Sequence, residues 1–314
     1  MSNSILITVI GPTASGKSHL AVGLGSTLGG EIVNCDSMQL IRGMNIGTAK
    51  PTLTDRKKLP HHLYDLIEPG EIYDAGQYMV AARRVCREIS SRGKTPIVVG
   101  GTGLYLRALL NGVFTGPGRN QELRQRLDKI GVRRGSGALV RLLKAVDPVT
   151  SERVHPSDLN RVIRALEGFY QSGVPISQLQ ALRQPIQDYK ILKIGLKVER
   201  KVLCDRINRR VDEMFRCGFL DEVGALLRQG YSPRTKGFEA IGYRYAASHL
   251  AGDMTLQDAI DKTCVSTRRY AKRQKTWFRK ESDVCWIEAP GDASEVLGKA
   301  LAIVEERIGQ DSQE

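Results

Sequence analysis

Eight residues near the N-terminus have the composition of a phosphate-binding loop. They read GPTASGKS and match the pattern G-x-x-x-x-G-K-[ST] without a gap. In such a loop, backbone N–H groups point inward and the lysine adds a full positive charge. The serine hydroxyl can ligate Mg²⁺. The sequence therefore predicts a site for a phosphorylated ligand that consists of Gly11, Pro12, Thr13, Ala14, Ser15, Gly16, Lys17 and Ser18, with Ser18 as the Mg²⁺ ligand.

The position of the next acidic residue indicates what happens to the phosphates. An NTP hydrolase usually carries an acidic residue at the end of a later apolar strand. Here the apolar run 96–99 ends in Gly100-Gly101-Thr102, and the acid follows the run 31–34 instead, at Asp36. The pattern favours transfer of a group to an acceptor other than water.

Residues 267–280 combine cations with aromatic rings. The segment has seven basic residues, no acidic one, and the rings of Tyr270 and Trp277. On a helix, such cations can contact RNA phosphates and such rings can stack unpaired bases. The alternative is a solvated basic face whose two rings pack on the core.

The overall charge also favours a polyanionic partner. Forty-seven basic and 34 acidic residues give a formal charge of +13. No apolar stretch is long enough to span a membrane, and no signal-peptide pattern occurs, so we expect a soluble, cytoplasmic protein. Six cysteines without a CxxC pair predict no zinc site.

The elements that would position these residues alternate between strand and helix. Apolar runs at 5–10, 31–34 and 96–99 alternate with helical patterns at 16–28 and 74–92, which predicts a parallel sheet. The region after this has helical patterns near 121–130, 137–146 and 158–171, with breaks at Gly131, Asp147-Pro148 and 173–175. A strand at 189–198 then returns to the sheet, followed by helices at 199–217, 219–228 and 255–281 and a strand at 284–288. We therefore predict a P-loop-type α/β core from 1–115 and 189–314, with an inserted all-helical domain at 116–188.

In combination, these segments resemble the tRNA dimethylallyltransferase (tRNA isopentenyltransferase) family in its bacterial form, without a zinc-finger extension. The matching segments are GPTASGKS (11–18), DSMQ (36–39), RGMNIGTAKP (42–51), GGTGLYL (100–106), NRVIRALE (160–167), INRRVDEM (207–214), GFLDEV (218–223), AIGYR (240–244) and AKRQKTWFR (271–279). The resemblance implies transfer of a dimethylallyl group from dimethylallyl diphosphate, bound with Mg²⁺, to N6 of the adenine at position 37 of tRNA. ATP would not be consumed, although the loop is often labelled as nucleotide-binding.

The resemblance also implies roles for residues of the reaction. Asp36 would accept the proton of the adenine amine as the C–N bond forms. Thr102 would lie near the oxygen that bridges the isoprenoid carbon and the diphosphate. Lys17 and Arg210 would hold the diphosphate, although Arg210 could instead be a solvated residue that is confused with Arg206 or Arg209.

Contacts to tRNA are implied at three places. The flipped adenine would be read by Asp36, Ser37, Met38, Gln39 and Thr102. Contacts from the insertion would come from Arg124, Asn160, Arg161, Val162, Ile163 and Arg164, although Val162 and Ile163 could equally be core residues. Contacts from the core would come from Glu239, Ala240, Ile241, Gly242, Tyr243, Arg244, Lys272, Arg273, Gln274, Lys275, Thr276, Trp277, Phe278 and Arg279. We assign only a structural role to His61 and His62, and expect a monomer.

Three other functions remain open on the sequence. An adenylate isopentenyltransferase would perform the same chemistry on free AMP or ATP. A small-molecule P-loop kinase would use Asp36 to activate a hydroxyl. An RNA-binding protein could carry a vestigial P-loop, although Lys17, Ser18, Asp36 and Thr102 are all intact.

Overall fold

The computed structural model describes residues 4–114 and 116–309, with side chains up to Arg307. The chain divides into two compact units. One consists of residues up to Leu109 together with those from Gln187 onward, and the other is Leu110–Ile186. Residue 115, where the sequence predicts the first boundary, lies outside the described residues.

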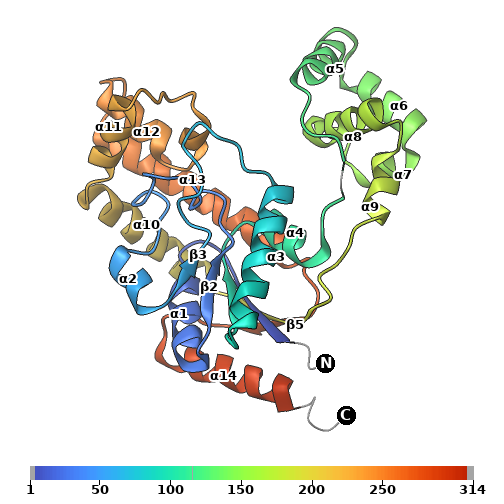
Figure 1. Cartoon of the computed structure of the whole chain (residues 1–314). Coiled ribbons are helices and arrows are strands. Elements are labelled where there is room, and N and C mark those ends of the chain that lie inside the picture. Colours follow the sequence, from blue (N-terminus) through green and yellow to red (C-terminus); the bar gives the residue numbers. More distant parts are fainter. Residues whose placement is uncertain (1–3, 115, 310–314) are drawn as a thin grey trace. The chain divides into compact units, whose positions relative to one another are not determined.

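A six-stranded sheet forms the centre of the first unit, and all of its neighbouring strands are parallel. The strand order is β3-β2-β4-β1-β5-β6 (Figure 1). The strands are β1 (Ser4–Ile10), β2 (Glu31–Asn34), β3 (His61–His62), β4 (Pro96–Val99), β5 (Tyr189–Leu196) and β6 (Val284–Ile287). The predicted α/β fold with a parallel sheet is confirmed. Since the strands are parallel, their carboxyl ends meet at one edge of the sheet, where α/β proteins place their ligands.

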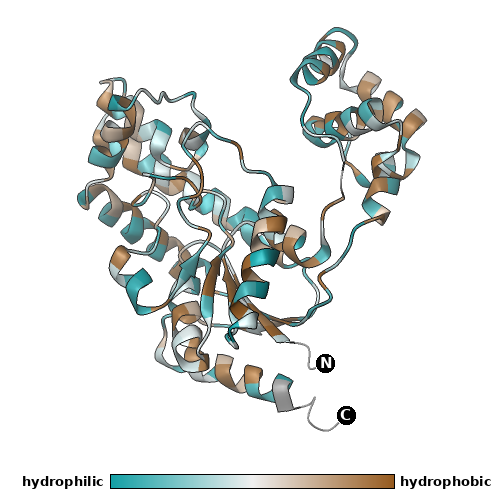
Figure 2. Cartoon of the chain, in the orientation of Figure 1, coloured by the Kyte–Doolittle hydropathy of each residue, from teal (hydrophilic) through white to brown (hydrophobic). Residues whose placement is uncertain are grey.

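Two hydrophobic clusters stabilise this unit. In one, the central strands pack with α1 (Lys17–Leu28) and with α14 (Ser294–Gly309), which brings the last helix beside the first (Figure 1). The other lies among α10 (Arg200–Arg216), α11 (Phe219–Arg228), α12 (Tyr243–Leu250) and α13 (Leu256–Phe278). Figure 2 shows the strands as largely hydrophobic, as expected for a sheet covered on both faces. The remaining helices of this unit are α2 (Leu53–Lys58), α3 (Ala75–Ser91), α4 (Gly103–Asn111) and a 3-10 turn, η1 (Lys236–Glu239).

The second unit is helical. Its helices are α5 (Gln121–Arg134), α6 (Ser136–Val146), α7 (Pro148–Arg153), α8 (Leu159–Ser172) and α9 (Ile176–Ala181). Its core contains Leu127, Leu139, Leu143 and Leu166. The predicted helix break at Gly131 is wrong: a Cβ there would lie 3.1 Å from Leu139 Cδ1, so the glycine allows close packing inside α5. The helix ends instead at Gly135, which has a φ of 77°.

The short helices α2, α4, α7, α9 and α12 and the terminal helix α14 were not predicted from the sequence, and α13 ends at Phe278 rather than at 281. Of the described helices, none combines the length and the apolar character that crossing a membrane requires.

Candidate active site

The phosphate-binding loop joins β1 to α1, as predicted. Gly16 has a φ of 85° and Ala14 a φ of 61°, left-handed conformations that wrap the backbone around a central space. The first turn of α1 contains no acidic residue, so the partial positive charge of its N-terminus is not neutralised there. Lys17, the first residue of α1, donates from Nζ to the carbonyl of Pro12 at 2.9 Å. The loop therefore has the geometry and the charge to hold an anion.

Segments from far along the chain brace this loop. The N–H of Gly291 donates to the carbonyl of Ser15 at 2.8 Å. Arg206 donates from Nε to the carbonyl of Ala14 at 2.8 Å and pairs with Asp292 at 2.7 Å. A Cβ on Gly16 would lie 2.6 Å from the nitrogen of Gly291, so only glycine permits this contact.

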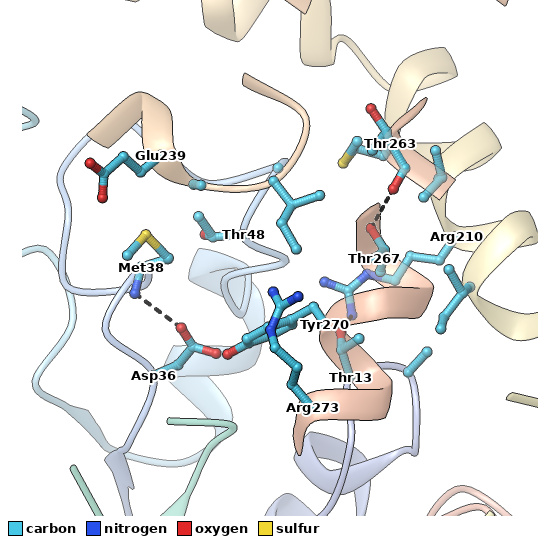
Figure 3. A pocket seen from close by; sticks show the side chains of 17 residues that line it. Thr13, Asp36, Met38, Thr48, Arg210, Glu239, Thr263, Thr267, Tyr270 and Arg273 are labelled. Atoms are coloured by element: carbon cyan, nitrogen blue, oxygen red, sulfur yellow. Dashed lines mark hydrogen bonds between the residues drawn. The ribbon is translucent and has the colours of Figure 1, made fainter. Parts of the chain in front are cut away.

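Asp36 follows β2, at the carboxyl edge of the sheet. The Asn34 side chain accepts from the N–H of Asp36 at 2.9 Å and donates to the carbonyl of Leu63 at 2.9 Å, which fixes the turn. One Asp36 oxygen accepts from the N–H of Met38 at 3.0 Å. The carboxylate and the hydroxyl of Tyr270 face each other (Figure 3). One carboxylate oxygen is thus held by the backbone while the group as a whole faces a cavity.

Thr102 lies beside Asp36 because the turns after β2 and β4 are in contact. Its N–H donates to the carbonyl of Cys35 at 3.1 Å. Its hydroxyl accepts from the N–H of Ser37 at 3.0 Å. A Cβ on Gly100 would lie 2.1 Å from the Cys35 oxygen, so a glycine is required where these turns meet. The structure thus brings together the predicted residues Asp36, Ser37 and Thr102.

Arg210 lines both the cavity beside Asp36 and the pocket beside Lys17 and Ser18, whereas Arg206 and Arg209 line only the latter. It donates from Nη1 to the hydroxyl of Thr13 at 3.2 Å. Arg209 is exposed, and Arg206 is occupied by Asp292. The alternative of a solvated Arg210 is therefore wrong, because its guanidinium lies against the phosphate-binding loop.

A cavity of about 230 Å³ lies between Asp36, Arg210 and the residues Thr13 and Ala14 of the phosphate-binding loop. Figure 3 shows Asp36, Arg210, Tyr270 and Arg273 around it. Its polar part lies next to Thr13, and its apolar wall includes Ile207. The other lining residues are Ala14, Met38, Gly47, Thr48, Val211, Met214, Glu239, Ala240, Ile241, Thr263 and Thr267. Such a cavity can hold a small apolar group next to an anion on the loop.

The charges of the site perturb one another. Burial lowers the pKa of Lys17 to about 8; Asp36 acts against this effect and Arg210 adds to it. Burial raises the pKa of Asp36, against the opposing effects of the Met38 N–H, Lys17 and Arg210. A carboxylate with a raised pKa is a better proton acceptor than an exposed one.

Several residues that were expected to contact RNA have other roles. Gln274, Tyr243 and Phe278 are buried, so their side chains pack inside the first unit rather than on its surface. Gln39 donates from Nε2 to the carbonyls of Thr48 and Ala49 at 3.0 and 3.1 Å. This amide therefore shapes the loop that follows it.

In the helical unit, one buried carboxylate engages two of the predicted RNA contacts. Glu167 has no exposed side-chain area, and it pairs with Arg124 and with Arg164 at 2.9 Å each. Val162 and Ile163 are buried in the same core, so the packing alternative is correct for them. Asn160 and Arg161 are exposed, and Arg161 pairs with Asp158 at 3.2 Å.

Tyr270 was expected only as an aromatic ring on a basic helix and not as a residue of the active site. In the structure, Tyr270 lines the cavity. Burial and the Asp36 charge both raise its pKa, so the hydroxyl stays protonated. One signal was present: Tyr270 lies four residues before Gln274, on the same face of the helix.

Glu222 holds one wall of the cavity. Its carboxylate accepts from the N–H groups of Asn45 and Ile46 at 2.8 Å each and of Gly47 at 3.2 Å. It also accepts from the hydroxyl of Tyr243 at 2.6 Å. Gly47 lines the cavity. Glu222 thus links α11, α12 and the loop 45–49 without contacting the cavity itself.

We expect Glu222→Gln to lower the free energy of unfolding by roughly 2 kcal/mol, because an amide offers one acceptor oxygen where two are used. The control is Asp221→Asn, which makes the same change of charge at the neighbouring, exposed residue. Denaturant unfolding measures both, and equal stabilities of the two variants would contradict the role given to Glu222.

The sequence of this chain is similar to sequences of one known family. Residues 39–281 match the family described as IPP transferase. The tRNA dimethylallyltransferase of Koribacter versatilis is 45% identical over 305 residues, covering 97% of this chain and 99% of the relative. That of Geobacter metallireducens is 46% identical over 297 residues, covering 94% and 96%.

Solved structures show the same likeness. The tRNA isopentenylpyrophosphate transferase of Bacillus halodurans is 37% identical with a TM-score of 0.71, over 98% of this chain and 99% of that one. A eukaryotic dimethylallyltransferase acting on tRNA is 26% identical with a TM-score of 0.83, over 98% and 80%. By sequence and by fold, this chain belongs to the IPP transferase family.

Proposed function

We propose that this protein transfers a dimethylallyl group from dimethylallyl diphosphate to N6 of the adenine at position 37 of tRNA, giving N6-(dimethylallyl)adenosine and diphosphate. One observation carries the proposal. The cavity that joins the half-buried carboxylate of Asp36 to an apolar wall shares Ala14 and Arg210 with the pocket that Lys17 and Ser18 of the anion-binding loop line. The relatives named tRNA dimethylallyltransferase support the same reaction.

The residues of the cavity divide the chemistry between leaving group and acceptor. As the bond between the isoprenoid carbon and oxygen breaks, negative charge grows on the diphosphate. The loop N–H groups, Lys17 and Arg210 stabilise that charge. The N6 amine forms the new C–N bond, and Asp36 accepts the proton that it releases. Thr102 lies beside Asp36, where its hydroxyl accepts from the N–H of Ser37 and donates to the Ser37 hydroxyl at 3.3 Å. With the donor bound, this hydroxyl would donate to the bridging oxygen instead.

The donor groups of the site fit Mg²⁺ held largely by its substrate. No group of three or more His, Cys, Asp or Glu able to bind a metal occurs among the described residues. Mg²⁺ commonly binds to one or two protein oxygens together with substrate phosphates. Ser18 is exposed at the start of α1 and would supply such an oxygen. When bound, the ion would neutralise charge on the diphosphate.

The RNA would contact exposed cations of both units. On α13, Lys272 and Arg273 are exposed close to Tyr270, which lines the cavity, and Arg279 is exposed directly after the end of this helix. In the insertion, Asn160 and Arg161 would contact the anticodon stem-loop.

We expect Lys272→Ala and Arg279→Ala each to weaken stem-loop binding and to reduce the slope of log Kd against log salt concentration by about 1. The control is Lys262→Ala, at an exposed position nearer the start of α13. Fluorescence titrations at several salt concentrations measure the slope. If Lys272→Ala and Arg279→Ala both keep the wild-type slope, as Lys262→Ala should, the C-terminal end of α13 is not the RNA contact.

One assay distinguishes the proposed function from its rivals. The protein is incubated with Mg²⁺, radiolabelled dimethylallyl diphosphate, and either an anticodon stem-loop or AMP. Label in the stem-loop alone supports the proposal, and label in AMP indicates an adenylate isopentenyltransferase. If neither acceptor is labelled, the protein is not a dimethylallyltransferase. The remaining alternatives are then a kinase, which an assay of phosphoryl transfer from ATP would detect, and an RNA-binding protein.

A further inference from the structure

Gln274 differs from its neighbours on the basic helix. Lys272 and Arg273 are exposed, whereas Gln274 is only 5% exposed. Burying an amide is unfavourable unless both its donor and its acceptor are satisfied. The contacts of this side chain therefore indicate why a polar residue occupies an inward position of α13.

The amide bridges two loops of the active site. Its Oε1 accepts from the N–H of Thr13, in the phosphate-binding loop, at 2.8 Å. Its Nε2 donates to the carbonyl of Gly101, directly before Thr102, at 2.9 Å. A Cβ on Gly101 would lie 2.2 Å from Nε2, so the close approach requires glycine there. Three segments far apart in the sequence thus meet at one side chain.

At each end of the bridge, further hydrogen bonds lead to residues that have a proposed role in the reaction. Thr13 also accepts from Arg210 through its hydroxyl at 3.2 Å, which places it on the diphosphate side. Thr102 accepts from the N–H of Ser37 at 3.0 Å, which places it on the Asp36 side. The bridge therefore fixes the distance between the groups that hold the leaving group and the group that accepts the proton.

We propose that Gln274 is a positioning residue for the transfer reaction, which aligns the phosphate-binding loop with the Gly101–Thr102 turn and anchors both to α13. This inference rests on the proposed function. The helix α13 also carries the proposed RNA contacts. The same helix would therefore both bind RNA and align the diphosphate site. Gln274 itself does not contact RNA.

Only a side chain with one donor and one acceptor at this distance can form the bridge. Glutamate would keep the acceptor for Thr13 but place an oxygen against the carbonyl of Gly101. Methionine has a similar length but forms neither hydrogen bond. Gln274→Met therefore removes the bridge with little change of volume, and Gln274→Glu removes one half of it.

The test compares Gln274→Met and Gln274→Glu with Gln257→Met, which makes the same substitution at an exposed glutamine of α13. Three quantities are measured: the Kd of inorganic diphosphate with Mg²⁺, the Kd of an anticodon stem-loop, and the single-turnover rate of label transfer. We expect Gln274→Met to bind diphosphate and to transfer label about 10- to 100-fold less well, and Gln274→Glu a few-fold to about tenfold less well, since each buried hydrogen bond contributes a few-fold to tenfold. Stem-loop affinity should change less than about twofold, and Gln257→Met should match the wild type.

The outcomes separate this inference from the proposed function. Wild-type diphosphate affinity and transfer rate in both Gln274 variants would overturn the positioning role. Loss of stem-loop affinity alone would overturn it as well, since Gln274 would then be an RNA contact. Failure of the wild type to transfer label would refute the proposed function, while the diphosphate affinities would still decide whether Gln274 shapes the loop. Gln274→Glu keeps the test valid if Gln274→Met unfolds, because its side chain is isosteric with glutamine.

Discussion

Asp36→Asn is expected to lower the single-turnover rate of transfer by about 10²- to 10⁴-fold, the range typical for loss of a positioned proton acceptor. The substitution is isosteric, and Oδ1 can still accept from the N–H of Met38. An amide does not accept the N6 proton, so the loss should lie in the chemical step. Affinity for the anticodon stem-loop should stay within about threefold of the wild type.

The matched control is Asp221→Asn, which removes a carboxylate from an exposed position of α11. Rates are measured with saturating stem-loop and labelled dimethylallyl diphosphate. Near-normal turnover of Asp36→Asn would remove Asp36 from the role of proton acceptor. A parallel loss of stem-loop affinity would assign it to binding instead.

Lys17→Met is expected to lower kcat/KM for dimethylallyl diphosphate by roughly 10²- to 10³-fold, as removal of one preorganised donor does at other charged transition states. The lysine is the one cation within the phosphate-binding loop itself. Methionine removes the charge and preserves most of the volume of the lysine side chain. The measurement is steady-state kinetics with the RNA held at saturation.

The lowered pKa of Lys17 gives this prediction a pH dependence. The protonated form binds the diphosphate, and the pKa in the free enzyme is about 8. Therefore kcat/KM should be high below pH 8 and should fall about tenfold per pH unit above it. Lys17→Arg keeps a positive charge across this range, so this variant should lose the alkaline decline even if its activity is lower.

Neighbouring charges should shift that decline in opposite directions. Asp36 raises the pKa of Lys17, whereas Arg210 lowers it. Asp36→Asn should therefore move the loss of diphosphate binding to lower pH, and Arg210→Met should move it to higher pH. An alkaline decline that stays in place in both variants would show that another group causes it.

The sequence by itself determined the elements with a strong local signal. The phosphate-binding loop, the strands 31–34 and 96–99, and the position of Asp36 were predictable because periodicity and loop composition depend on neighbouring residues. Short helices such as α12 were missed, since six to eight residues carry too little periodicity to distinguish them from loops.

Only the tertiary structure decided which side of a helix each polar residue faces and what it contacts. Gln274 and Thr13 are 261 residues apart, and Arg210 and Thr13 are 197 apart. Glu167 pairs with two arginines that were predicted from the sequence to contact RNA. Such pairings form when packing excludes water and every buried polar group must find a partner, so they depend on the whole fold rather than on any local pattern.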